Sequence, residues 1–229
     1  MCEHFVARGG EPFRIDTLWE MTERLERYGL AGFGWGAAWL TGDGTLATYR
    51  DIGAFRDDPG RDDVGANETT AVLVHLRRPS KLSTIGLPDT QPFLDPAGRF
   101  ALSHNGDLER YRSWRDLYRR AGRIEGSADS EAGARWLEDQ WRDGEPAAHL
   151  LGALHDTFGG DANLALLDRS GRAHMYAGNA QNPVFSYRLG KVDVVSTGIY
   201  SLDRSLFRYV VPAARERRLV ALNRTASLA

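Results

Sequence analysis

The sequence predicts an α+β protein built in layers, with two β-sheets and helices packed against them. Short apolar runs typical of strands occur in two batches, one in the first half of the chain and one near its end. Segments with the helical spacing of apolar residues lie between these batches. The chain has 229 residues, 42% of them hydrophobic and 26% charged, so it can bury a core without disulfides or metal ions.

The first half of the chain predicts one helix followed by strands. Thr17–Glu20 fits a capping box, and apolar residues then recur at helical spacing as far as Gly29. Strands are expected at 33–40 and 46–50, at 71–76 and near 100–102. The second half predicts helices at 108–118, 130–141 and 150–158, and then strands at 164–167, 173–176, 184–187 and 192–195. No repeat or linker divides the chain.

Charge and composition disfavour several functional classes. The 29 basic and 31 acidic residues nearly cancel, which argues against general binding of nucleic acid. One cysteine cannot form an internal disulfide, and the six histidines lack metal-binding spacing, so we expect no metal ion. No cofactor motif occurs in its required context, so no cofactor is expected. Because no apolar run reaches the roughly 18 residues of a membrane span and no signal peptide is apparent, we expect a cytoplasmic protein with no membrane partner.

Cys2 is the first candidate for chemistry. Removal of Met1 would leave a cysteine that carries a nucleophile and a base in one residue. The thiol has a reference pKa of about 8.5 and the α-amine one of about 7.7–8.0, so the amine can accept the thiol proton near neutrality. The alternative is that Cys2 is an incidental second residue.

Three further candidates follow predicted strands or precede a helix, and each has a plain structural alternative. Arg77 can bind a carboxylate through two parallel hydrogen bonds, or it is a surface arginine. Asn105 and Gly106 can both donate to a developing oxyanion, or they form a turn. Asp129 can receive an ammonium group, or it caps a helix.

Taken together, five segments in this order resemble the class II glutamine amidotransferases of the N-terminal-nucleophile hydrolase superfamily, and the stand-alone type in particular. The segments are Met1-Cys2, Gly34-Trp35-Gly36, His75-Leu76-Arg77, His104-Asn105-Gly106 and Asp129-Ser130-Glu131. The resemblance extends from Cys2 to about residue 202. It implies a four-layered αββα sandwich, and a single amidotransferase domain over residues 2–229 once Met1 is removed.

The resemblance also implies a role for each residue. Cys2 would attack the side-chain amide of glutamine, with Asn105 and Gly106 forming the oxyanion hole. Glutaminase activity would release ammonia to an acceptor or to a separate synthase, and water would resolve the thioester. The residues implied to bind the substrate are Arg77 at the α-carboxylate, Ser80 as its helper, Asp129 at the α-ammonium, and Trp35 and Gly36.

Two positions depart from the family pattern and keep other functions open. Phe33 stands where relatives carry an acidic or amide residue, and Gln91 replaces the usual histidine before Pro-Phe. These changes favour, as one alternative, a stand-alone γ-glutamyl amidohydrolase of small-molecule biosynthesis with a substrate other than free glutamine. A second alternative is a catalytically inactive regulatory or binding protein of the same fold.

Overall fold

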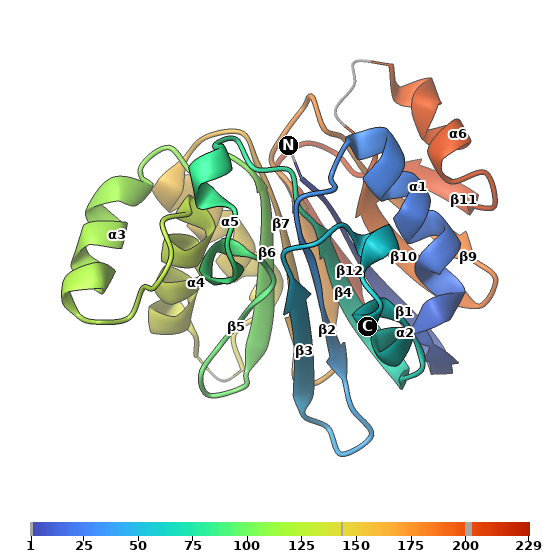
Figure 1. Ribbon diagram of the computed structural model, residues 1–229, viewed down its shortest axis with the longest axis horizontal. Helices are drawn as coiled ribbons and strands as arrows, with labels where there is room; N and C mark the ends of the chain where they lie inside the picture. The colour runs from blue at the N-terminus through green and yellow to red at the C-terminus, as the bar shows by residue number, and fades with distance from the viewer. Residues whose placement is uncertain (1, 143, 200–202) are drawn as a thin grey trace.

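Two antiparallel sheets form the centre of the computed structural model, which describes residues 2–142, 144–199 and 203–229 (Figure 1). The larger sheet contains, in spatial order, β11 (Arg215–Leu219), β9 (Val184–Leu189), β10 (Val192–Thr197), β1 (Glu3–Arg14), β4 (Glu68–Leu76), β2 (Trp35–Leu40) and β3 (Leu46–Asp51). The smaller sheet contains β12 (Arg224–Leu228), β8 (Ala173–Ala177), β7 (Ala162–Asp168), β6 (Phe100–Gly106) and β5 (Phe93–Leu94).

Helices cover the outer faces of both sheets. Figure 1 shows α3, α4 and α5 beside the smaller sheet and α1 and α6 beside the larger one. The α-helices are α1 (Trp19–Gly29), α2 (Gly60–Gly65), α3 (Tyr111–Arg120), α4 (Asp129–Gln140), α5 (Ala147–Phe158) and α6 (Phe207–Val210). Short 3-10 helices occur at η1 (Ile15–Leu18), η2 (Phe55–Asp57), η3 (Leu82–Thr84), η4 (Leu87–Asp89) and η5 (Arg204–Leu206). Among the described residues, none of the helices combines the length and the apolar character needed to cross a membrane.

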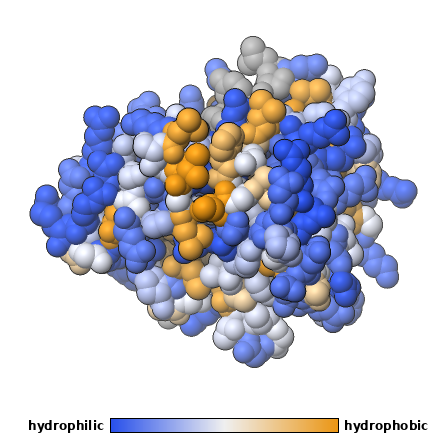
Figure 2. All heavy atoms as spheres, in the orientation of Figure 1, coloured by the Kyte–Doolittle hydropathy of each residue, from blue (hydrophilic) through white to orange (hydrophobic). Residues whose placement is uncertain are grey.

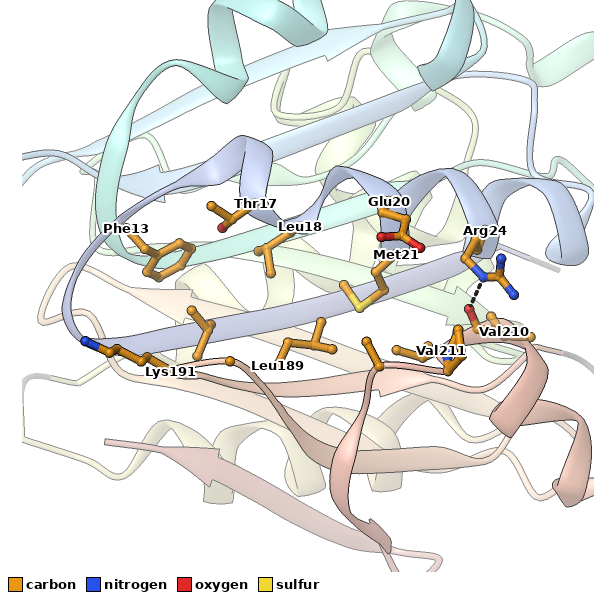
Figure 3. A pocket seen from close by; sticks show the side chains of 14 residues that line it. Phe13, Thr17, Leu18, Glu20, Met21, Arg24, Leu189, Lys191, Val210 and Val211 are labelled. Atoms are coloured by element: carbon orange, nitrogen blue, oxygen red, sulfur yellow. Dashed lines mark hydrogen bonds between the residues drawn. The ribbon is translucent and has the colours of Figure 1, made fainter.

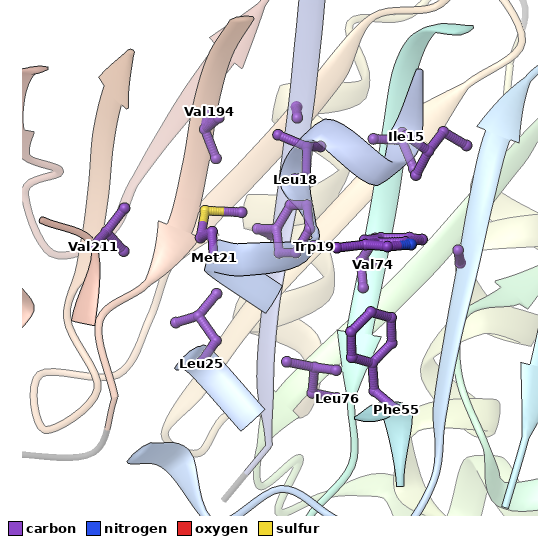
Figure 4. Close-up of a cluster of buried hydrophobic side chains, with 14 of the residues drawn as sticks. Ile15, Leu18, Trp19, Met21, Leu25, Phe55, Val74, Leu76, Val194 and Val211 are labelled. Atoms are coloured by element: carbon purple, nitrogen blue, oxygen red, sulfur yellow. The ribbon is translucent and has the colours of Figure 1, made fainter. Parts of the chain in front are cut away.

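Strand alternation separates three layers of buried side chains. In β1, Phe5 and Ala7 belong to the cluster that packs beneath α1 (Figure 4), whereas Val6 belongs to the cluster between the two sheets. In β6, Phe100 and Leu102 pack against α3, α4 and α5. The order is therefore helices, sheet, sheet and helices, and the predicted α+β sandwich of four layers is confirmed.

Four strands were not predicted: β1, the two-residue β5, β11 and β12. β1 contains Gly9-Gly10-Glu11-Pro12, a turn-like sequence, and its pairing with β4 shifts register between Arg8 and Phe13. β11 and β12 are edge strands with little apolar alternation, and all five residues of β11 are exposed.

The predicted capping box at Thr17 is wrong. Thr17 lies inside η1, and its hydroxyl donates to the carbonyl oxygen of Arg14 at 2.6 Å. Leu18 occupies the N-cap position of α1, and no side chain caps that helix.

Candidate active site

A cavity of about 640 Å³ opens where the start of β1 and the ends of β4 and β6 come together. Its wall is largely polar, and it combines segments that are far apart in the sequence. The lining includes Cys2, the loop that follows β4, the segment between β6 and α3, and the residues that begin α4. Of the predicted site residues, Cys2, Arg77, Ser80, Gly106 and Asp129 line this cavity.

A second cavity, of about 420 Å³, lies outside the larger sheet between α1 and the turn that joins β9 and β10 (Figure 3). Phe13, Leu18, Met21 and Val211 contribute to its mainly apolar wall. One of its charged side chains, Arg24, donates to the carbonyl oxygen of Val210 at 2.8 Å. No cysteine and no predicted site residue lines this cavity, so we assign the chemistry to the larger cavity.

Cys2 is half-buried at the start of β1. Its Sγ accepts a hydrogen bond from the backbone N–H of Arg78 at 3.3 Å. Burial raises the pKa of the Cys2 thiol, while the Arg78 N–H and the positive charge of Arg77 act in the opposite direction. The thiol is therefore protonated near neutral pH, and a base has to remove its proton before it can attack.

Arg77 continues the chain from β4 and is buried. Its guanidinium Nη2 donates to the carbonyl oxygen of Thr84 at 2.5 Å and to the Thr84 hydroxyl at 3.1 Å. Its Nη1 is buried and has no hydrogen-bond partner among the described residues. Burial lowers the pKa of Arg77, and the nearby Cys2 and Asp89 act in the opposite direction. The guanidinium of Arg77 thus keeps one fixed donor that no described residue pairs with.

Asn105 lies in β6, on the face that is directed toward the larger sheet. Residues 103 and 105 share one face of the strand, and the Ser103 hydroxyl is bonded to Nδ1 of His4 in β1 at 2.9 Å. Cys2 directly precedes β1, two residues before His4. Asn105 is fully buried and is not among the residues that line the cavity. Neither atom of its amide group has a hydrogen-bond partner in the described part of the chain.

Gly106 lines the cavity directly after Asn105. Its φ is 134°, and a Cβ at this position would lie 1.9 Å from the carbonyl oxygen of Asp161. No other residue fits here without a shift of the backbone. The glycine thus allows the end of β6 to pass close to the backbone of Asp161 while it borders the cavity.

Asp129 is the first residue of α4 and lines the cavity. Its Oδ2 accepts a hydrogen bond from the backbone N–H of Leu108 at 2.8 Å, and its Oδ1 accepts one from the N–H of Ser130 at 2.8 Å. Ala128 occupies the N-cap position, so Asp129 is not the N-cap. The backbone bonds fix a carboxylate at the cavity wall, where it can receive an ammonium group.

Asp89 is a cavity residue without a sequence signal. Its Oδ1 accepts hydrogen bonds from the backbone N–H groups of Ser127 and Ala128 at 2.6 and 2.7 Å. Its Oδ2 accepts one from the Ser127 hydroxyl at 3.1 Å. Through these hydrogen bonds, the buried Asp89 holds the segment before α4, and with it Asp129, against the loop that contains η4.

We expect Asp89→Ala to lower the free energy of unfolding by about 3 kcal/mol, since it leaves three donors around a buried site without their acceptor. Asp89→Asn retains an oxygen acceptor and should lose less than half of that. Urea unfolding of both variants measures the difference. Equal losses would mean that the charge of Asp89, and not its hydrogen bonds, holds the segment.

A histidine network joins β1, β4 and β6 between the two sheets. Ser103 Oγ is 2.9 Å from Nδ1 of His4 and 2.7 Å from Nδ1 of His75. A hydroxyl has one proton, so it can donate to only one of the two rings and must accept from the other. Burial lowers the pKa of His4 to about 3 and places the pKa of His75 well below its usual value. Both rings are therefore neutral in the folded protein, and protonation of either ring favours the unfolded state.

This network makes stability sensitive to acid. A histidine in the unfolded chain has a pKa of about 6.5, so the unfolded state binds protons first as the pH falls, and stability decreases. Glu3 acts in the opposite sense, because burial raises its pKa to about 7. The contribution of Glu3 to stability is complete when the pH is below the ordinary pKa of about 4.5, and it is lost as the pH rises through 7. Between pH 7 and pH 5, the two histidines together lose more stabilising free energy than Glu3 gains. We therefore expect a lower urea midpoint at pH 5 than at pH 7.

The variant His4→Asn tests this account. It keeps a polar side chain beside Ser103 but removes the titrating group. The loss of stability between pH 7 and pH 5 should then shrink by about 2 kcal/mol, which is the contribution of one buried neutral histidine at pH 5. An unchanged pH profile would show that His4 does not titrate differently in the two states.

Trp35 and Gly36, predicted to bind substrate, do not line the cavity. Trp35 is fully buried in the core beneath α1, where its Nε1 donates to Asp58 Oδ2 at 2.8 Å. A Cβ at Gly36 would lie 2.4 Å from the carbonyl oxygen of Gln91. These contacts give Trp35 and Gly36 packing roles in β2.

The two departures from the family pattern have different positions. Phe33 is exposed and does not line the cavity, although its backbone N–H donates to the carbonyl oxygen of Arg77 at 3.1 Å. Gln91 does line it. The Gln91 amide accepts from the N–H of His104 at 2.6 Å and donates to the His104 carbonyl and to Ser130 Oγ, both at 3.1 Å. Gln91 thus joins β6 to α4 and has its amide occupied by the protein.

The loop after β4 has polar side chains at the cavity and apolar ones elsewhere on the surface. Arg78, Ser80 and Lys81 line the cavity, whereas the exposed Leu82 and Leu87 do not. In the orientation of Figure 1, Figure 2 shows apolar side chains gathered near the middle of that face of the molecule. Ser80, the predicted helper of Arg77, is itself exposed at the cavity wall.

No metal site emerges in the described ranges, because they contain no group of three or more histidine, cysteine, aspartate or glutamate side chains that could hold an ion. Arg78, Asp89 and Arg112 line the cavity but were not predicted as site residues. Nothing in their local sequence distinguishes them, since their position depends on how distant loops meet.

No family model matches the sequence, and no curated protein does. Solved structures do match. One, titled the allosteric regulatory enzyme of purine biosynthesis, has a TM-score of 0.76 and 16% identity over 99% of this chain and 46% of that chain. Glutamine phosphoribosylpyrophosphate amidotransferase from B. subtilis has a TM-score of 0.70 and 15% identity over 99% of this chain and 49% of the other.

A third solved structure is close to this chain in length. The glutamine aminotransferase class-II domain protein from Silicibacter pomeroyi has a TM-score of 0.61 and 17% identity, over 98% of this chain and 94% of that one. By contrast, the chain spans about half the length of the two larger enzymes. The two-sheet arrangement of this chain in Figure 1 is matched by these neighbours over 98–99% of its length. The chain therefore shares the fold of these solved structures, among them a glutamine phosphoribosylpyrophosphate amidotransferase and a glutamine aminotransferase class-II domain protein, as the sequence resemblance predicted.

Proposed function

We propose that the chain is a class II glutamine amidotransferase, formed by a single domain over residues 2–229 after removal of Met1 and acting in the cytoplasm. The observation that carries this proposal is the meeting of Cys2, Arg77, Gly106 and Asp129 at one cavity. A thiol, a cation, an anion and a backbone-lined oxyanion site are the groups that hydrolysis of glutamine requires. The buried Asn105 amide, which has no partner among the described residues, supports the same chemistry.

In the proposed reaction, the free α-amine of Cys2 removes the proton from the thiol. The thiolate attacks the side-chain carbonyl carbon of glutamine, and the Asn105 amide and the Gly106 N–H stabilise the developing oxyanion. The carbon–nitrogen bond breaks, the nitrogen takes up the proton held by the amine, and ammonia leaves. Water then adds to the thioester, which releases glutamate and restores the thiol.

Arg77 and Asp129 orient the substrate in this scheme. The unpaired Nη1 of Arg77 binds the α-carboxylate, and the carboxylate of Asp129 binds the α-ammonium. The two groups hold the amino-acid end of glutamine so that its side chain extends to Cys2. The ammonia passes to an acceptor or to a separate synthase.

The test is the release of ammonia and glutamate from glutamine by protein whose intact mass shows that Met1 is absent. Both products in equal amounts support the proposal. Addition of a synthase that accepts ammonia should raise the rate if the chain serves as its glutaminase subunit. No release from glutamine or from any γ-glutamyl amide would favour a regulatory or binding protein of the same fold.

A second candidate is a stand-alone γ-glutamyl amidohydrolase. The size of the cavity favours it, since cavities of roughly 300–1,000 Å³ hold ligands much larger than glutamine. The chemistry at Cys2 is the same, but an amine leaves in place of ammonia. Poor turnover of glutamine and rapid turnover of a larger γ-glutamyl compound distinguish this candidate from the first.

A further inference from the structure

The smaller cavity, between α1 and the turn that joins β9 and β10, has a largely apolar wall (Figure 3). The buried side chains of Leu18, Met21, Val192, Val210 and Val211 contribute to it. With a volume of about 420 Å³, this cavity falls within the range of roughly 300–1,000 Å³ that is usual for small-molecule sites. Transfer of an apolar molecule from water to such a wall is favourable.

The backbone of one wall segment is already bonded to the protein. Arg24 Nε donates to the carbonyl oxygen of Val210 at 2.8 Å. Arg217 Nη2 donates to the carbonyl oxygens of Val211 and Pro212, both at 3.0 Å. Each of these carbonyl oxygens thus has a donor within the protein, so the segment offers a ligand mainly apolar contact.

The charge of this cavity is concentrated at one end. Among the described residues, the charged side chains that line it are Glu20, Arg24 and Lys191. Glu20 and Arg24 are four residues apart on α1, so they lie on the same face of the helix and their opposite charges offset each other. Lys191 lies in the turn between β9 and β10, and Figure 3 shows it at the opposite end of the cavity from Arg24.

Lys191 is therefore the cation that determines the net charge of the lining. It is exposed, and it forms no ion pair within the described part of the chain. An anion bound to its ammonium group would keep part of its hydration shell, so the ion pair would not incur the full cost of burying a charge. An apolar wall with an unpaired cation at one end is complementary to a molecule with an apolar body and a single anionic group.

We propose that this cavity binds a small monocarboxylate with an apolar body, such as a medium-chain fatty acid. The carboxylate binds the ammonium group of Lys191, and the apolar body packs against Leu18, Met21 and Val211. No described residue lines both this cavity and the cavity of Cys2, so the proposal is independent of the proposed function.

Three ligands with the same chain separate the contributions of apolar contact and charge. Isothermal titration calorimetry at low ionic strength compares octanoate, octanol and octylammonium. An apolar cavity without a cation prefers the alcohol, because a charged group loses more hydration than a hydroxyl. We expect octanoate to bind at least about threefold more tightly than octanol, the contribution of one exposed ion pair, and octylammonium to bind most weakly. Added salt should reduce the preference for octanoate.

The variant Lys191→Gln should reduce the ratio of octanoate affinity to octanol affinity to about one or less, with little change in the binding of octanol. The matched control is Arg208→Gln, which removes an exposed cation from α6 without changing the cavity lining. This control should keep the ratio of the unmodified protein.

A second variant, Leu189→Trp, tests the location of the apolar body. Leu189 is a half-buried residue of the lining, and a larger side chain there occupies part of the cavity. This variant should weaken the binding of octanoate and octanol by about tenfold or more. Urea unfolding of both variants shows whether the fold is retained.

Three results would overturn the proposal. Folded protein that binds no octanoate has no such site. Tighter binding of octanol or octylammonium than of octanoate contradicts the anionic ligand. Octanoate binding that both Lys191→Gln and Leu189→Trp leave unchanged places the ligand elsewhere on the molecule. None of these results depends on whether the protein hydrolyses glutamine.

Discussion

Replacing Cys2 with alanine is expected to reduce the hydrolysis of glutamine, or of a preferred γ-glutamyl amide, by at least about 10⁴-fold. The variant retains the cavity, Arg77 and Asp129, but it has no atom that can form the thioester. The α-amine cannot replace the thiol, because its part in the reaction is to move a proton. Measurement of kcat with a sensitive assay for glutamate checks the prediction.

The matched control for this variant is Cys2→Ser, which keeps the shape of the side chain and offers a weaker nucleophile. Both variants should unfold with a free energy within about 1 kcal/mol of the unmodified protein, since Cys2 is only half-buried. A stable Cys2→Ala variant that keeps more than about a hundredth of the activity would contradict covalent catalysis by this residue.

Replacing Asn105 with leucine is expected to affect activity and stability in opposite directions. Its buried amide has no partner among the described residues, and such a group costs about 1–3 kcal/mol of stability. Leucine has a similar size and no polar atoms, so the variant should be more stable by about 1 kcal/mol or more. Loss of the amide donor should reduce kcat by about 10²–10³-fold.

Urea unfolding and steady-state kinetics on the same preparations measure the two effects. The matched control is Ser103→Ala, on the same face of β6, which removes a hydroxyl that does have partners, His4 and His75. This control should lower stability. If Asn105→Leu also proves less stable and retains full activity, its amide has a structural partner and is not part of an oxyanion hole.

The sequence was most informative where strand alternation and helical spacing are clear. The strands β2, β4, β6 and β7 and the helices α3, α4 and α5 lie where the apolar pattern predicted them. β1 was missed because Gly9 and Gly10 precede a proline inside the strand, a pattern typical of a turn. β11 was missed because all five of its residues are exposed, and β12 because only its alternate residues Ala226 and Leu228 pack against an apolar cluster.

For the site, the sequence supplied the chemical groups but not their surroundings. Cys2, Arg77, Gly106 and Asp129 were predicted from the resemblance, and all four line one cavity. Trp35 was predicted beside them from the same pattern, yet it belongs to the core. A motif records which residues occur together in sequence, whereas burial and contact depend on how separate elements pack. For the same reason, the charged wall formed by Arg112 and the loop after β4 left no sequence signal.

The proposed function requires Cys2 to act as a reactive nucleophile in a cavity that binds a γ-glutamyl group. The most direct test is the intact mass of the protein before and after incubation with a diazo-ketone analogue of glutamine. We expect loss of Met1 and the addition of one analogue, and we expect this addition to be absent in Cys2→Ala and prevented by excess substrate. Retention of Met1, or an analogue added equally to Cys2→Ala, would contradict it.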